Sequence, residues 1–262
     1  MNKFALRRML KSIGAAVISI FLFLVVWQIS TTGTEFGKLM PSPVKVLAAL
    51  GRSFVEPIGK HTILGHIGYS LSRVLVAYLL ACVIGNVLGL GMARNLWIRA
   101  IFRPFYEIVR PIPPIAWISL AILWFGLGES MKWFIIFLSA FASIAYTTFS
   151  GAQKVDPKLI GAAKMLGANS VQVFTTVVLP ASIPYVFSGM QVALGTSWAT
   201  VVAAEMVRSS EGVGWIIVTG MESNNMQQIM VGIVTIGVVG LLLTTLLRNL
   251  EKKLCEWNVG GV

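Results

Sequence analysis

Two charged residues, Arg73 and Glu205, lie within apolar runs that are long enough to span a membrane, and they are the first candidates for chemistry. A charge at the middle of a bilayer costs about 2.5–3.5 kcal/mol on insertion scales and less near an interface, so such a residue usually has a partner. Each of the two falls near one end of its run. We therefore expect Arg73 and Glu205 to form a structural or gating ion pair, in preference to direct substrate binding by the carboxylate.

A second group of candidates is polar but uncharged, and it lies in the run that contains Glu205. Its hydroxyls could donate hydrogen bonds to an anionic solute without a buried charge, and this predicts a solute path along Thr196, Ser197, Trp198 and Thr200. Hydrogen bonding between helices is the alternative for the same side chains.

Prolines interrupt another apolar run at Pro113 and Pro114, shortly before Trp117. Proline removes a backbone donor, and broken backbone at membrane depth is tolerated where it faces protein or a water-filled cavity. We therefore expect these three residues to line the same route; a kink that serves only packing is the alternative.

The sequence contains no pattern that predicts catalysis. There is no G-x-x-x-x-G-K-[ST] phosphate loop, no nucleophile–base–acid arrangement and no metal-spaced His/Cys cluster. His61 and His66 are five residues apart and would not share a helix face, and Cys82 and Cys255 would lie far apart across a membrane. The chain is expected to be catalytically silent, with no cofactor or metal of its own.

The composition indicates which solvent must surround these residues. Hydrophobic residues make up 56% of the chain and charged residues 12%, where soluble domains carry about 25% charged. Such a chain cannot cover its surface with water-compatible side chains, so lipid is the expected surrounding. The net charge of +11 could suggest nucleic acid, but the basic residues lie in short gaps between apolar runs. We expect no nucleic-acid partner.

Six apolar runs are long enough to cross a bilayer. They predict an all-α, polytopic membrane protein with about six transmembrane helices, and the absence of repeats or long linkers predicts one domain over residues 1–262. The runs cover residues 13–30, 70–92, 111–127, 133–150, 183–207 and 229–247.

The basic residues predict the orientation, because cytoplasmic loops retain Lys and Arg. With the N-terminus inside, and leaving out Arg73 and Arg110 near the membrane, thirteen basic residues fall on the cytoplasmic side and six on the other. Both termini are therefore expected in the cytoplasm. The inside set begins with an N-terminal segment that carries Lys3, Arg7, Arg8 and Lys11.

Small residues recur every four positions in two of the runs, a spacing that lets helices approach closely. The second run has Gly85 and Gly89 among them, and the fifth has Gly189, Ala193 and Ser197. Packing within the chain is the default interpretation, and contact with a second copy is the alternative.

The loop at about 151–183 contains clear signals for two short helices. Asp156 is a good N-cap, Pro157 suits the first helical turn, and Gly167 can end the helix in a left-handed conformation. Asn169 with Gln172 forms a potential capping box for a second helix. The loop is predicted to be a rigid knob on the cytoplasmic face.

The same loop carries a spacing that resembles a known family. Ala162 and Ala163 are followed after three residues by Gly167, and nine residues later by Val177-x-Leu179-Pro180. This resembles the coupling loop of permease subunits of ATP-binding-cassette (ABC) importers, which reads Glu-Ala-Ala, three residues, Gly, nine residues, Ile-x-Leu-Pro. Here Gly161 replaces the Glu and Val177 the Ile, so the resemblance implies an ATPase contact at Gly161, Ala162, Ala163, Gly167, Leu179 and Pro180 with less help from charge.

Further segments are similar to one branch of that family, the taurine, aliphatic sulfonate and nitrate permeases, with most similarity to the taurine type. They are RPIPPIAW at 110–117, ILWFGLGE at 122–129, VVAAE at 201–205 and GVG at 212–214. The similarity extends from Pro41 over the rest of the chain.

This resemblance implies a type I ABC importer permease-like bundle in a bacterial inner membrane, carrying a small organic anion. It implies cytoplasmic ABC ATPase subunits that hold ATP and Mg, an extracytoplasmic solute-binding protein, and a permease homodimer, since symmetric pairs are common. The main alternative is an ATP-independent secondary transporter or channel, which should show several intramembrane carboxylates.

Overall fold

The computed structural model describes the backbone of residues 3–255 and the side chains of residues 14–255, so the N-terminal basic side chains Lys3, Arg7, Arg8 and Lys11 lie outside the described residues. The fold is helical throughout the described range, with short turns between helices. Contacts divide the chain into two compact units, residues 1–64 with 216–235 and residues 65–215 with 236–262.

The first unit contains the N-terminal helices, among which α1 contacts α2 and α3. Its helices are α1 (Lys3–Thr31), α2 (Phe36–Leu39), α3 (Pro43–Ser53), the later part of α11 (Val213–Glu222) and the early part of α12 (Met226–Leu254). Gly232 packs against Ile217 within this unit, and a Cβ at Gly232 would lie 2.6 Å from an Ile217 side-chain atom. α11 was not among the predicted elements because ten residues fall short of a membrane span.

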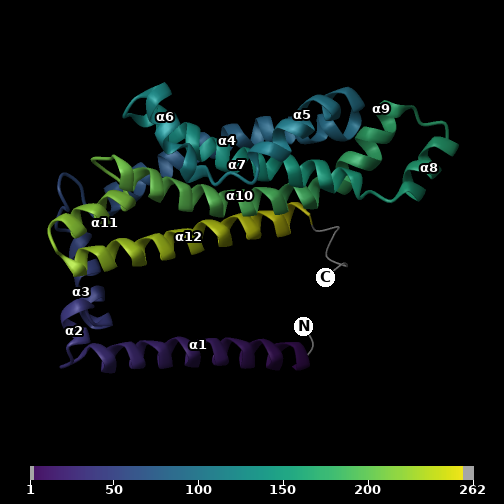
Figure 1. Cartoon of the computed structure of the whole chain (residues 1–262). Helices are drawn as coiled ribbons and strands as arrows, with labels where there is room; N and C mark the ends of the chain where they lie inside the picture. The colour runs from purple at the N-terminus through teal and green to yellow at the C-terminus, as the bar shows by residue number, and fades with distance from the viewer. Residues whose placement is uncertain (1–2, 256–262) are drawn as a thin grey trace. The chain divides into compact units, whose positions relative to one another are not determined.

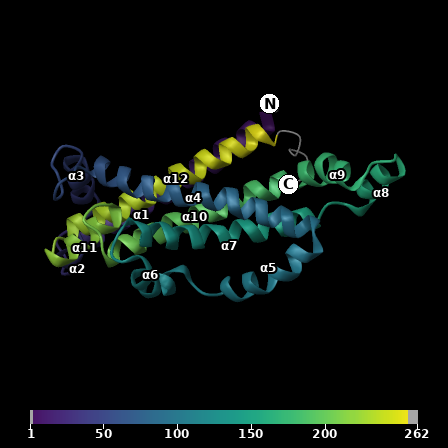
Figure 2. The same cartoon turned by 90° about the horizontal axis from the view of Figure 1, so that it is seen from above.

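The second unit is built around three long helices, α4 (Ile63–Arg94), α7 (Glu129–Gln153) and α10 (Leu179–Val207). They run side by side in both views (Figures 1 and 2). Glycine permits the contact between α4 and α7, because a Cβ at Gly89 would lie 2.8 Å from the carbonyl oxygen of Ala145. The core of this unit is apolar and includes Val74, Ala81, Ile136, Ala140, Ile144, Ala193, Trp198 and Val201.

The predicted third run, residues 111–127, is interrupted at its prolines, as the sequence indicated, and its helices have other bounds than the run. The structure has α5 (Leu96–Val109), then a break, then a 3-10 turn (Pro114–Trp117) that leads into α6 (Ile118–Phe125). The two halves meet at an angle of 92°. The cause is the run of prolines, which cannot donate backbone hydrogen bonds; Pro113, directly before Pro114, has ψ 135° and lies outside the helical region.

Counted by length and composition, the described residues contain five helices able to cross a membrane, or six if the bent pair forms one span. This confirms the predicted all-α polytopic class. Each predicted run, apart from the third, falls inside a longer helix that extends past the run at one or both ends.

The predicted knob is present as α8 (Pro157–Met165) and α9 (Ser170–Val173), which lie at one end of the α7–α10 pair (Figures 1 and 2). Asp156 Oδ1 accepts from the Lys158 amide at 2.8 Å. Asn169 and Gln172 form the predicted capping box. Gly167 has φ +86°, the left-handed conformation that ends α8.

One feature between α9 and α10 was not predicted. Residues Phe174–Val178 form a π-turn, in which the Leu179 amide donates to the carbonyl of Phe174 five residues back. Pro180 has no amide for the carbonyl of Thr176 and its ring crowds that position, so widening the turn relieves the clash. The helical backbone thereby continues from Ser170 to Val207, and the fifth span is longer than predicted.

Candidate functional site

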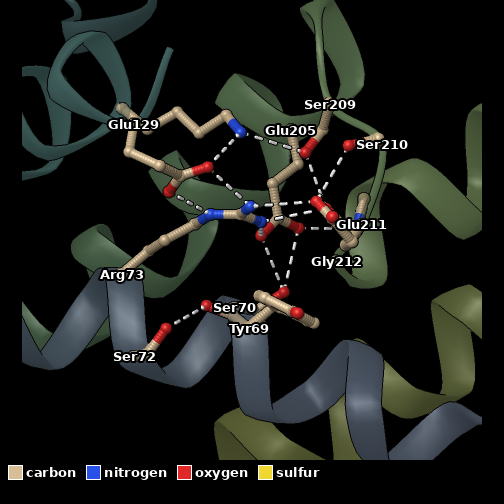
Figure 3. Close-up of polar contacts among 12 residues, drawn as sticks. Tyr69, Ser70, Ser72, Arg73, Glu129, Glu205, Ser209, Ser210, Glu211 and Gly212 are labelled. Carbon is tan, nitrogen blue, oxygen red and sulfur yellow. Dashed lines mark hydrogen bonds and ion pairs between the residues drawn. The ribbon is translucent and has the colours of Figure 1, made fainter. Parts of the chain in front are cut away.

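The first candidate site is a network of charged side chains centred on Arg73, which is only 2% exposed (Figure 3). The guanidinium donates two hydrogen bonds to the Glu129 carboxylate, from Nε at 2.6 Å and from Nη2 at 2.7 Å. Its Nη1 donates to Glu205 at 2.8 Å and to the carbonyl of Glu211 at 2.9 Å. One planar cation from α4 therefore binds α7, α10 and the loop that follows α10.

The Glu205 carboxylate is also buried, at 1% exposure, and its charge is satisfied from several directions. The Ser70 hydroxyl donates to both carboxylate oxygens at 2.8 and 2.9 Å. The Gly214 amide, in the first turn of α11, donates to Oε2 at 3.0 Å. Amides in the first turn of a helix have no partner within the helix and favour an anion, so the start of α11 stabilises the Glu205 charge.

Gly212 makes this approach possible. Its φ of +116° is disfavoured for other residues, and a Cβ on it would overlap the Glu205 carboxylate. The Gly212 amide donates to His66 Nδ1 at 3.1 Å, and the Val213 amide donates to Ser70 Oγ at 2.9 Å. The turn at residues 212–214 is therefore fixed to α4 by its backbone.

Lys132 completes the network. Its Nζ donates to Glu129 Oε1 at 2.8 Å and to Ser209 Oγ at 3.1 Å. The network holds two cations, Arg73 and Lys132, against the carboxylates of Glu129, Glu205 and Glu211. Its members come from α4, α7, α10, α11 and the loop between α10 and α11. It can lock these elements together, and it releases them only if several charge-assisted hydrogen bonds break at once.

The second candidate site is a cavity of about 530 Å³ between α5, α7 and α10, all within the second unit. Small-molecule sites span roughly 300–1,000 Å³, so its size suits a small solute. Its polar lining consists of Tyr106, Arg110, Ser139, Ser143, Tyr146, Thr147, Thr196 and Thr200. Among the described residues, no cluster of His, Cys, Asp and Glu could hold a metal ion, here or elsewhere.

The structure places only part of the predicted path at this cavity. Pro114, Thr196 and Thr200 line it, whereas Pro113 and Trp117 do not. Trp117 Nε1 is buried without a hydrogen-bond partner among the described residues.

Ser197 and Trp198 also lie away from the cavity lining, for a reason of helix geometry. Successive residues turn by about 100° on a helix, so positions four apart share a face and their neighbours point elsewhere. Trp198 packs in the core and donates to the carbonyl of Ile236 at 3.0 Å. Ser197 is fully buried and its hydroxyl has no partner in the described part of the chain.

The predicted coupling residues lie at the other end of the second unit from α6 (Figure 1). Ala162 is exposed on α8, Ala163 is half-buried, and Gly161 has open space where a side chain would be. Beside them, Met165 and Leu166 are 85% and 89% exposed. Leu179 and Pro180 are half-buried in the first turn of α10.

The sequence interpretation missed six of the polar cavity residues, namely Tyr106, Arg110, Ser139, Ser143, Tyr146 and Thr147. Arg110 Cζ lies 4.3 Å from the centre of the Tyr146 ring, and the Tyr146 and Tyr106 rings stack with 5.6 Å between centres. A signal existed in α7, where Ser139, Ser143 and Thr147 recur every four residues on one face. It predicts a polar stripe, although it does not identify what the stripe faces.

Comparison with known proteins gives the family. Residues 85–254 match the family described as binding-protein-dependent transport system inner membrane component. The taurine transport system permease protein TauC of Escherichia coli (strain K12) is 32% identical, over 96% of this chain and 91% of its own. The nitrate import permease protein NrtB of Synechocystis sp. is 33% identical, over 90% of this chain and 86% of its own.

Solved structures agree on the fold. A crystal structure of an amino acid ABC transporter with histidines aligns with a TM-score of 0.64 at 14% identity, covering 79% of this chain and 96% of that one. These matches confirm the resemblance drawn from the coupling-loop spacing. The chain belongs to the family of binding-protein-dependent inner membrane components, the permease subunits of ABC importers.

Proposed function

We propose that this chain forms the translocation path for a small organic anion, such as taurine, an alkanesulfonate or nitrate, and that a separate ATPase drives it through α8 and α9. The observation that carries the proposal is the exposed, fully capped α8–α9 pair with alanines on its surface. Small side chains let a helix sink into a groove of a partner protein. ATP and Mg would be held by the ATPase, and the chain itself would do no chemistry.

The proposed assembly has two permease copies, two cytoplasmic ATPase subunits and an extracytoplasmic solute-binding protein. Residues 1–262 act as one permease domain in the bacterial inner membrane, with both termini in the cytoplasm. Large apolar side chains remain exposed on the single chain, including Trp97 at 79% and Leu123 at 79%. In the assembly they face lipid or the second permease copy.

In this scheme the Arg73–Glu205 network is a gate at the end of the bundle away from α8. Binding of ATP draws the two α8–α9 pairs together, the helices rock, and access to the cavity switches sides. The network suits a gate because its members come from four helices and one loop, so their relative movement breaks it as a unit.

The experiment that tests the proposal is uptake into proteoliposomes that contain the permease, its ATPase and its solute receptor. Uptake should require ATP and loaded receptor, and the ATPase should co-purify with the permease. The rival is an ATP-independent transporter. Uptake that survives ATP depletion while a proton gradient is maintained would favour that rival and refute the proposal.

Gly167→Val and Ala163→Trp are expected to uncouple transport while the protein still inserts in the membrane. The left-handed conformation at Gly167 costs a β-branched residue about 1–3 kcal/mol, which distorts the end of α8. Tryptophan at position 163 would hold α8 out of the ATPase groove. Losing about 1.4 kcal/mol or more of docking free energy lowers ATP-dependent uptake by about tenfold or more.

Gly33→Val is the matched control, because Gly33 also has a left-handed φ, +73°, but lies in the first unit. It should show similar backbone strain and keep uptake coupled to ATP hydrolysis. Normal ATP-dependent uptake by the Gly167→Val and Ala163→Trp variants would show that α8 is not the drive point.

A further inference from the structure

Arg110 is the only charged residue among the described residues that line the 530 Å³ cavity. Along the chain its nearest acid is Glu107, which pairs instead with Arg103 at 2.7 Å. No carboxylate of the described residues lies within ion-pair distance of Arg110. Its contact is the face of the Tyr146 ring, 4.3 Å from Cζ, which steadies a cation without neutralising it.

Hydroxyl groups line the same cavity as this cation. The Tyr106 hydroxyl is buried and has no partner among the described residues, although Tyr106 lines the cavity. Ser143 lines the same wall from α7, and its hydroxyl makes no hydrogen bond to the described residues. The Thr200 hydroxyl lies 3.1 Å from Ser139 Oγ, so α7 and α10 together present a polar surface opposite α5.

Arg110 also lies at a junction. A second cavity of about 230 Å³ shares Tyr106, Arg110 and Tyr146 with the first and continues past the Arg103–Glu107 pair to Gln153, at the end of α7 near α8. A solute that moves between the two cavities must pass the guanidinium and the two stacked rings. An intramembrane ionisable residue in such a place marks a solute pathway.

We propose that Arg110, held on Tyr146 and assisted by the Tyr106 and Ser143 hydroxyls, is the binding site for the anionic group of the transported solute. A guanidinium is weakly hydrated and presents a planar fork of donors that matches the oxygens of an oxyanion such as a sulfonate or nitrate. Hydroxyl donors fill the remaining acceptor positions. The absence of any carboxylate in the described lining of the larger cavity removes repulsion of the anion.

This inference rests on the proposed function, because it assigns a solute group to the path of an importer. It is tested by an assay that needs no ATPase. Ser143→Cys is made in a chain that also carries Cys82→Ala and Cys255→Ser, both native cysteines being buried. In native membrane vesicles the new thiol is modified with 2-sulfonatoethyl methanethiosulfonate, which carries a sulfonate, or with the cationic 2-(trimethylammonium)ethyl reagent.

The measured quantity is the ratio of the thiol's reaction rate with the sulfonate reagent to its rate with the cationic reagent. With Arg110 present, this ratio should be higher than the ratio for a free thiol in solution. Arg110→Gln should lower that rate ratio by about two hundredfold, because one unit charge at about 10 Å and an effective dielectric of about 20 changes each of the two rates by about sixteenfold, in opposite directions. Arg110→Lys keeps the charge and should keep most of the preference. In a control chain with Leu166→Cys in place of Ser143→Cys, Arg110→Gln should leave the ratio unchanged, because Leu166 lines neither cavity and is 89% exposed.

The anion site would be refuted if Arg110→Gln left the rate ratio of the Ser143→Cys thiol unchanged. It would also be refuted if Arg110→Lys lowered that ratio as much as Arg110→Gln does. Uptake assays on the same variants separate this failure from that of the proposed function. If the thiol assay shows the charge preference but uptake ignores ATP, the importer proposal fails and the anion site stands. If uptake is ATP-dependent and the preference does not depend on Arg110, only the anion site fails.

Discussion

Replacing Arg73 with leucine is expected to lower the free energy of unfolding by about 3–5 kcal/mol, because it leaves a buried carboxylate without its cation. Glu205 is 1% exposed and would keep only the Ser70 hydroxyl and the Gly214 amide as partners. Glu129 would lose two short hydrogen bonds, but it retains Lys132 and is partly exposed. The loss should therefore arise mainly at Glu205.

Titration from a mild detergent into dodecyl sulfate, followed by loss of helix signal, measures this free energy. Arg103→Gln is the matched control, since Arg103 also pairs with a glutamate at 2.7 Å but both side chains are 57% exposed. Exposed pairs of this kind contribute about 0.3–0.5 kcal/mol. A loss for Arg73→Leu no larger than that of the control would mean that water reaches Glu205 and that the network is not a buried lock.

The double variant Arg73→Leu with Glu205→Leu separates charge burial from packing. Removing both members of a buried pair leaves no uncompensated charge, so it should recover about 2 kcal/mol of the loss in the single variant. Full additivity of the two single losses would show that the residues act independently. The difference between the loss in the double variant and the sum of the two single losses therefore tests whether Arg73 stabilises the buried charge of Glu205.

The ion pair between Arg73 and Glu205 could be predicted from the sequence, because an unpaired charge in a membrane-spanning run is costly and these runs contain few other charged residues. The rest of the network could not, since Glu129 and Lys132 lie at a helix end where charge is inexpensive and gives no signal. The amides of Val213 and Gly214 carry no side-chain signal at all. Their role depends on where α11 begins, and that follows from the left-handed turn at Gly212.

The long helices could be predicted from the sequence, whereas the angle between α5 and α6 could not. Length and hydropathy identify a span, but the prolines at 111, 113 and 114 indicate only that the backbone breaks. The bend measures 92°, and α6, which follows it, packs against α7. Arg110 illustrates the consequence, because a basic residue beside a predicted span looks like a loop residue until the bend places it over Tyr146.

Gly189→Val is expected to destabilise the protein by about 3 kcal/mol, because α7 and α10 touch where Gly189 has no side chain. A Cβ at Gly189 would overlap Thr147 Oγ1 and lie 2.8 Å from Thr147 Cβ. Rotation of the threonine can move Oγ1, but Cβ is fixed to the backbone. Valine can therefore be accommodated only if the two helices move apart.

Gly195→Val is a matched control on the same helix, since a Cβ at Gly195 would have no neighbour within 4 Å. Both variants change the helix propensity by the same amount, so the difference between them reports contact with α7 alone. Thermal unfolding followed by size-exclusion chromatography in detergent compares them. Equal midpoints for the two variants would contradict the close approach.

The position of Gly189 also relates packing to the cavity. Thr147 lines the cavity from α7, and Thr196 and Thr200 line it from α10, so the separation of these helices sets the width of the polar surface opposite Arg110. The hydrogen bond from Thr200 to Ser139, at 3.1 Å, spans the same interface and should break as the helices separate. In a Gly189→Ala variant, which should fold at lower cost, we therefore expect altered sulfonate-reagent reactivity of the Ser143→Cys thiol even where expression is normal. Unaltered reactivity would mean that α10 and α7 adjust without widening the cavity.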